Sequence, residues 1–256
     1  MHQPEEILRE IRRITEEILG GSLVGIYVHG SLAFGCFTWE KSDIDYLVVI
    51  RAPMTQAQKV EYIRRIFKLN QKAPPKGIEM SVVLAEHCRN FVHPTPYELH
   101  FSCGHLDSIR EDPEGYCARM QGVDPDLAAH FTVTRAVGHV LCGAPVGEVF
   151  APVPPRDYLD SIRYDVENAA EDIFENPVYM TLNLCRVLAY MRENAVLSKV
   201  QGGEWGLRCL PDKYHGILAG ALRAYAADGK FCAEEHREVL TDFAQYMLRR
   251  IFGGGQ

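Results

Sequence analysis

The chain has 256 residues, of which 47% are hydrophobic and 24% charged, and its formal net charge is −7. This composition is typical of a soluble globular protein with one large or two modest domains. The acidic balance argues against general nucleic-acid binding, which needs a basic face, and suits a cationic ligand better. No apolar run reaches the ~18–20 residues of a membrane span. We expect a cytoplasmic protein, because the charged first segment does not resemble a secretory signal and the cysteines form no Cys-x-x-Cys pair.

The first part of the chain alternates predicted helices and strands. Apolar residues at helical spacing predict an amphipathic helix over residues 4–19, which Gly20 and Gly21 end. A second helix over 56–70 can be capped by Thr55. The remaining predictions here are strands over 22–28, 42–50 and 78–84 and a helix over 125–140, whereas 91–105 is turn-rich and receives no assignment.

The second part of the chain contains no convincing strand. The segment "APVPP" (151–155) predicts a linker. After it, helices are predicted at about 156–174, 177–194, 198–206, 212–227 and 232–252. We therefore expect an α+β fold in which residues 1–152 form a domain with a mixed sheet flanked by helices. Residues 153–256 then form an all-α helical bundle.

Three acidic residues stand where buried strands are expected. Asp43 and Asp45 fall in one predicted strand, where residues i and i+2 point to the same face. Two carboxylates so close repel each other and need a cation between them. Glu79 lies near the start of the third predicted strand and joins them if the two strands are neighbours. Such a cluster can hold one or two Mg²⁺, which prefer oxygen ligands.

The turn at Gly30 and Ser31 supplies a complementary feature. A glycine allows backbone N–H groups to approach a phosphate closely, and the Ser31 hydroxyl adds a donor. Carboxylates that bind metal beside a phosphate cradle indicate phosphoryl or nucleotidyl transfer.

The three acids also have purely structural interpretations, and so do two cationic residues later in the chain, Arg186 and Lys199. Asp43 and Asp45 could cap a turn, and Glu79 could be a charge that protects an edge strand from aggregation. Arg186 could form an ion pair with an acid of the segment 157–175, and Lys199 could be a surface lysine at a helix end.

In this order, Gly30-Ser31, Asp43-Ile44-Asp45 and Glu79 resemble the signature of the polymerase-β-type nucleotidyltransferase superfamily. Within it, the chain resembles the aminoglycoside nucleotidyltransferases that adenylylate streptomycin and spectinomycin. The closer resemblance rests on "TLNLCRVLAY" (181–190), "LSKVQGGEW" (197–205), "LP" (210–211) and "RAYAA" (223–227).

The resemblance implies a role for each matching residue in the nucleotide site. Residues 1–152 would be the nucleotidyltransferase domain, and 153–256 the helical domain that closes on nucleotide and substrate. Glu79 would be the catalytic base, and Asp43, Asp45 and Glu79 would hold two Mg²⁺. The residues expected to bind ATP are Gly30, Ser31, Ser42, Arg186, Lys199 and Tyr225.

The acceptor site departs from the family pattern. Glu167 falls at the position of a tryptophan in relatives that take streptomycin, and Asp172 at that of an aspartate. Two further family positions fall on Asn176 and Tyr179, and "YELHFS" (97–102) replaces a Gly-Glu-Trp stretch. On the predicted helix 156–174, Asp165 and Asp172 flank the apolar stripe together. We expect them to face a cleft and bind amines.

The sequence thus predicts a magnesium-dependent O-adenylyltransferase that moves AMP from ATP to a hydroxyl of an aminoglycoside or aminocyclitol antibiotic. Spectinomycin should be used at least as well as streptomycin, because Glu167 offers no flat stacking surface. We expect a monomer with no nucleic-acid or membrane partner. Two alternatives remain open: adenylylation of a protein, RNA or another small acceptor, and a nucleotide-binding module whose catalysis has lapsed.

Overall fold

The computed structural model describes residues 4–226 and 231–253. The chain folds into two compact units, Met1–Pro154 and Pro155–Gln256. All eight cysteines are free thiols. Among the described residues, no helix combines the length and apolar character needed to cross a membrane.

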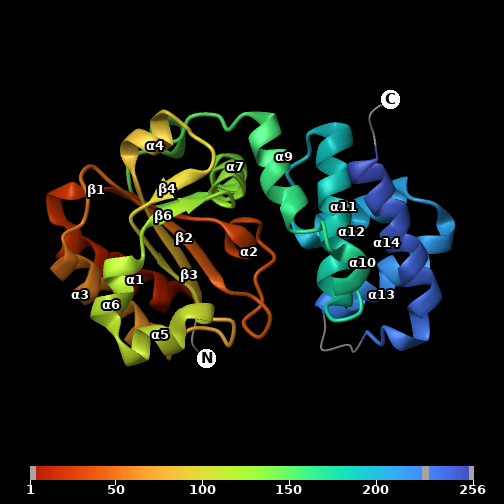
Figure 1. Cartoon of the computed structure of the whole chain (residues 1–256), viewed down its shortest axis with the longest axis horizontal. Coiled ribbons are helices and arrows are strands. Elements are labelled where there is room, and N and C mark those ends of the chain that lie inside the picture. Colours follow the sequence, from red (N-terminus) through yellow and green to blue (C-terminus); the bar gives the residue numbers. More distant parts are fainter. Residues whose placement is uncertain (1–3, 227–230, 254–256) are drawn as a thin grey trace. The chain divides into compact units, whose positions relative to one another are not determined.

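The first unit is built on a five-stranded mixed sheet with the order β5-β3-β2-β1-β7. Figure 1 labels its strands β1, β2 and β3. β2 and β3 are parallel, and the other neighbouring pairs are antiparallel. The strands are β1 (Leu23–Val28), β2 (Ile44–Ile50), β3 (Ile78–Leu84), β5 (Leu99–Phe101) and β7 (His139–Gly143). Two short strands, β4 (Thr95–Tyr97) and β6 (Gly122–Asp124), pair separately. The mixed sheet confirms the predicted fold class.

Helices cover both faces of this sheet. The helices α1 (Pro4–Leu19) and α3 (Gln56–Asn70) pack on one face, where Ile11 and Ile63 meet Tyr46. Helix α7 (Leu127–Val137) covers the other face, where Phe131 packs with Leu47. The shorter helices are α2 (Gly30–Ala33), α4 (Ala85–Arg89), α5 (Leu106–Glu111), α6 (Pro113–Arg119) and α8 (Val146–Val149), with 3₁₀ turns η1 (Gly20–Ser22) and η2 (Cys103–His105). Because successive strand residues point to opposite faces of the sheet, every second residue of β2 and β3 points to the same face.

The predictions for α1, α3 and β3 are confirmed, including the cap at Thr55, whose side chain accepts a hydrogen bond from the backbone of Gln58. Two predicted elements of the first unit extend at least two residues beyond the observed ones. The second predicted strand begins at Ile44, so Ser42 and Asp43 precede it. The predicted helix 125–140 ends at Val137, because the residues after Gly138 form β7 and satisfy their backbone groups by pairing with β1.

The described residues of the second unit form helices and connecting turns and contain no strand, as predicted. Its helices are α9 (Pro155–Tyr164), α10 (Ala169–Asp172), α11 (Pro177–Glu193), α12 (Lys199–Cys209), α13 (His215–Ala226) and α14 (Arg237–Phe252). Two 3₁₀ turns, η3 (Asp212–Tyr214) and η4 (Glu234–His236), precede α13 and α14. Helix α11 is central and packs against each of the other helices just named. The last residue of the predicted helix 212–227 lies outside the described residues.

The prediction of one helix over 156–174 was wrong. A turn over residues 165–168 separates α9 from α10, and the backbone N–H of Val166 bonds to the carbonyl of Arg163. Asp165 and Asn168 favour such breaks, because their short polar side chains compete for nearby backbone groups. Asp165 and Asp172 therefore do not share one continuous helical face.

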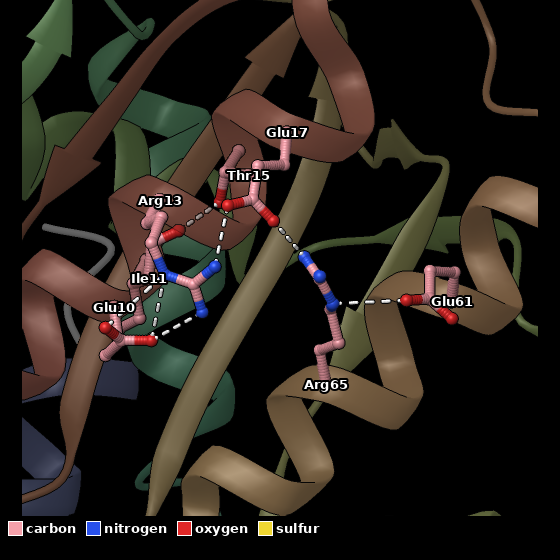
Figure 2. A network of polar contacts seen from close by, with 7 residues as sticks. All are labelled: Glu10, Ile11, Arg13, Thr15, Glu17, Glu61 and Arg65. Atoms are coloured by element: carbon pink, nitrogen blue, oxygen red, sulfur yellow. Dashed lines mark hydrogen bonds and ion pairs between the residues drawn. The ribbon is translucent and has the colours of Figure 1, made fainter.

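Polar contacts join α1 to α3 (Figure 2). Glu17 accepts hydrogen bonds from Arg13 and Arg65, each at 2.6 Å, and these bonds lower the pKa of its carboxyl. Exposed pairs of this kind add little to stability, because solvent screens the charges. A buried chain of hydroxyls on the same two helices and β2 has larger consequences: Tyr62 Oη lies 2.9 Å from Thr15 Oγ1 and 3.3 Å from Tyr46 Oη.

Tyr62→Phe should lower the free energy of unfolding of the first unit by about 1–3 kcal/mol, because it leaves the buried Tyr46 hydroxyl without its partner. Urea denaturation measures this change. Tyr164→Phe removes the same atom from an exposed side chain of the second unit (69% exposed), and should change the free energy of unfolding of either unit by less than about 0.5 kcal/mol. Equal stability of the Tyr62 variant and the parent protein would contradict the importance of the chain of hydroxyls.

Candidate active site

Three carboxylates meet at the amino ends of β2 and β3. Asp45 and Glu79 are partners in the parallel register, and Asp43 comes two residues earlier, just before β2 begins. One carboxylate oxygen from each residue lies within 4.8 Å of the other two. All three side chains are partly exposed. The structure thus brings together the predicted cluster, although Asp43 belongs to a loop rather than to the strand.

The surroundings of Glu79 disfavour an unpaired negative charge on its carboxyl. Burial raises the pKa of Glu79, and Asp43 and Asp126 raise it further, while His130 opposes them. A group of partly buried carboxylates with several oxygen donors is the kind of site that a hard divalent cation such as Mg²⁺ occupies in proteins. The donor set therefore fits the predicted metal.

Gly30 lies directly against Asp45. Its φ is +59°, and a Cβ on Gly30 would lie only 1.8 Å from Asp45 Oδ2. The backbone N–H of His29 also donates to the carbonyl of Asp45 at 3.0 Å. Both contacts require the loop after β1 to follow β2 closely, so a residue with a side chain cannot occupy position 30 without displacing the acid.

The two predicted serines lie in different environments. Ser31 Oγ is buried and has no hydrogen-bond partner among the described residues. Ser42 is also buried, and its Oγ accepts a hydrogen bond from the backbone N–H of Thr38 at 3.1 Å. A buried hydroxyl without a partner is costly, which makes Ser31 a candidate to donate to a bound anion.

His130 on the covering helix α7 and Asp126, which directly precedes this helix, were missed from the sequence. His130 of α7 lies 3.3 Å from Asp126 (Nε2 to Oδ2), and its ring centroid is 4.7 Å from that of His29. Burial alone would lower the pKa of His130, but Asp126, Glu79 and Asp45 together raise it to about 10. His130 therefore brings a positive charge to the acids. The sequence did contain a signal for this pair: an acid and a histidine four residues apart in a predicted helix lie side by side on its surface.

His100 was also missed, although it lies in the "YELHFS" segment. On β5 it is the register partner of Ser81, and its Nδ1 lies 3.0 Å from Ser81 Oγ. Burial, His105 and His130 lower its pKa to about 4. Glu79 and Ser81 are two residues apart on β3, so the neutral His100 ring stands on the same face of the sheet as Glu79.

The residues predicted to bind nucleotide in the second unit are held by local contacts. Arg186 Nε donates to the carbonyl of Leu197 and Nη1 donates to Asn183 Oδ1, both at 2.9 Å. Neither partner is an acid of the segment 157–175. Lys199 Nζ lies 4.8 Å from the ring centroid of Tyr179, so a residue predicted to bind nucleotide contacts one predicted to bind the acceptor. Tyr225 is part-buried on α13.

The other residues predicted to bind the acceptor follow one another along a single segment. Asp165 and Glu167 lie in the turn after α9, with Glu167 exposed and Asp165 partly buried. Asp172 ends α10, and the exposed Asn176 precedes α11. Together with Tyr179 they present three carboxylates, an amide and an aromatic ring.

Comparisons with known proteins find a matching family model for each of the two parts of the chain. Residues 8–101 match the family model "Nucleotidyltransferase domain", and residues 148–250 match "Aminoglycoside adenylyltransferase, C-terminal domain". A spectinomycin 9-adenylyltransferase of Staphylococcus aureus is 22% identical over 229 residues, which are 88% of this chain and 86% of the relative. An aminoglycoside (3'') (9) adenylyltransferase of Rhizobium radiobacter is 23% identical over 98% of this chain and 91% of its own.

A solved structure shares the fold. The crystal structure of the spectinomycin adenyltransferase AAD(9) from Enterococcus faecalis, determined with ATP and spectinomycin, matches with a TM-score of 0.78 at 19% sequence identity. The match covers 96% of this chain and 98% of the other. The mixed-sheet domain with its acids, the helical C-terminal domain and the order of the two matched family models lead to one conclusion. The chain combines a nucleotidyltransferase domain with a C-terminal domain that matches that of aminoglycoside adenylyltransferases, and it is a nucleotidyltransferase enzyme.

Proposed function

We propose that this protein is a magnesium-dependent O-adenylyltransferase that moves AMP from ATP to a hydroxyl of a cationic aminocyclitol antibiotic, with spectinomycin as the preferred acceptor. The observation that carries the proposal is the cluster of Asp43, Asp45 and Glu79 beside the Gly30-Ser31 turn. Relatives named spectinomycin 9-adenylyltransferase support the choice of acceptor. The ATP and spectinomycin in the related crystal structure support the choice of co-substrate.

In this proposal the first unit provides the groups that act on the phosphate and the hydroxyl. Glu79 removes the proton of the acceptor hydroxyl, and its raised pKa makes its carboxylate a stronger base than an exposed glutamate. Ser31 and the backbone after Gly30 bind the phosphates of ATP. Ser42 holds the adjacent loop by accepting from Thr38, and its hydroxyl donates a hydrogen bond to the same phosphates. Asp43, Asp45 and Glu79 would hold Mg²⁺, which stabilises negative charge on the transferred phosphate when bound.

The second unit provides cations and acids in this proposal. Arg186, Lys199 and Tyr225 bind ATP, and the two cations balance part of the triphosphate charge. The acceptor amines bind the carboxylates of the segment that follows α9, with Asn176 and Tyr179 beside them. The residues with these carboxylates are Asp165, Glu167 and Asp172.

Asp45→Asn should lower kcat/KM for adenylylation by at least about 10³-fold, because it removes a ligand charge while it preserves the contact with Gly30. Pyrophosphate release in the presence of ATP, Mg²⁺ and spectinomycin measures the rate, and chelation of Mg²⁺ should abolish it in the parent enzyme. Asp107→Asn is the matched control, since this carboxylate is 87% exposed on α5, where it pairs with Arg110. Near-normal turnover of the Asp45 variant at the Mg²⁺ concentration used for the parent enzyme would contradict the proposed metal site.

Lys199→Met should weaken ATP binding about tenfold or more, because it removes the ammonium group that lies over Tyr179 and keeps most of the apolar stem of the side chain. Isothermal calorimetry with ATP and Mg²⁺ measures the change. Lys213→Met removes an exposed lysine that pairs with Asp242, and it should leave ATP affinity unchanged. Equal ATP affinity of the Lys199 variant and the parent would assign Lys199 to the surface instead.

Spectinomycin should be adenylylated at least as efficiently as streptomycin. Streptomycin carries guanidinium groups that bind well to an aromatic face beside a carboxylate, and Glu167 offers charge without such a face. Steady-state kinetics with both antibiotics test this order. A clear preference for streptomycin would contradict the role given to Glu167, and transfer only to a protein or to another small acceptor would contradict the proposed substrate class.

A further inference from the structure

The acceptor hydroxyl must lie within hydrogen-bond reach of Glu79 if that residue is the base, so the rest of the acceptor must rest on groups close by. On one side of Glu79 lies β2 with the other acids. On its other side lies β5, the edge strand of the sheet. The residue of β5 that stands on the same face is His100, whose register partner Ser81 follows Glu79 by two residues. Diagonal neighbours of this kind in an antiparallel pair have Cβ atoms ~7–8 Å apart.

One ring nitrogen of His100 is hydrogen-bonded, and the other is available to bind a ligand. Its Nδ1 is bonded to Ser81 Oγ, and the described part of the chain provides no hydrogen bond to its Nε2. Two aromatic rings limit its rotation: the centroid of His105 lies 5.7 Å away and that of Tyr97 lies 6.3 Å away, both in edge-on arrangements. The backbone is held as well, because the Tyr116 hydroxyl donates to the His100 carbonyl at 2.7 Å.

The charge of the ring suits a cationic acceptor. Burial and the neighbouring histidines His105 and His130 lower the pKa of His100 to about 4, so the imidazole is neutral near pH 7. A neutral imidazole carries one donor and one acceptor nitrogen, whereas an imidazolium would repel an ammonium group. Depending on which partner donates in the Ser81 contact, Nε2 either accepts from an ammonium or hydroxyl group or donates to an oxygen.

We propose that His100 determines acceptor specificity by binding, through Nε2, a hydroxyl or amino group of the acceptor beside the hydroxyl that receives AMP. This inference rests on the proposed function, since it requires a hydroxyl acceptor at Glu79. It adds to the first unit a contact with the acceptor that does not involve the metal cluster. The alternative is that His100 only closes the edge of the sheet through Ser81.

Two variants separate these roles, because asparagine places its amide near the position of Nδ1 and glutamine places it near that of Nε2. His100→Asn can keep the contact with Ser81 but loses the group that faces the acceptor. It should raise the KM for spectinomycin about tenfold, with kcat and the KM for ATP nearly unchanged. His100→Gln should restore at least part of the affinity.

His139→Asn is the matched control, since this exposed histidine begins β7 at the opposite edge of the sheet, and the variant should leave the KM for spectinomycin unchanged. An unchanged KM in His100→Asn would overturn the inference, and so would an equal rise in His139→Asn. Both results would leave the proposed function intact. Absence of transfer to spectinomycin by the parent enzyme would instead contradict the proposed function, and this inference with it.

Discussion

The parallel register of β2 and β3 is the constraint on which the active site depends. It places Asp45 beside Glu79, and the loop before β2 adds Asp43. At separations within 4.8 Å, two full negative charges repel by about 3–4 kcal/mol at an effective dielectric constant of ~20. The sheet can keep these acids together because both strands are anchored farther along by buried apolar residues on both faces. The site is therefore held by the fold rather than by attraction among its own groups.

The electrostatics of the first unit follow from that arrangement. His130 approaches the acids from α7, and its raised pKa reflects their field as well as the ion pair with Asp126. His29 and His100 lie near the same cluster, yet burial lowers the pKa of each. His130 is thus an imidazolium, whereas His29 and His100 are neutral imidazoles. This mixture limits the net charge of the site without filling it with lysine or arginine, which would compete with a metal ion for the same oxygens.

Much of this architecture could be predicted from the sequence because its local signals agree with the fold. The Thr55 cap, the apolar spacing of α1 and the short apolar run of β3 gave correct elements. Strand β7 was missed because its exposed residues carry little apolar alternation and its partner β1 lies far away in the sequence. The break after α9 was missed because the buried residues Val166 and Ala169 continue a helical spacing across the turn. His100 and His130 were overlooked because their importance comes from strand pairing and helix packing, which the sequence does not display.

The approach of Gly30 to Asp45 has a consequence for reading related sequences. Asp45 can keep its position only because Gly30 has no Cβ, since a single methyl group at position 30 would overlap Asp45 Oδ2. A relative could therefore retain all three acids and its hydrophobic core and still have lost the arrangement they need. An inventory of charged residues alone would classify such a chain as competent. The residue to inspect beside the acids is the glycine, because it reports whether the loop after β1 can still lie against β2.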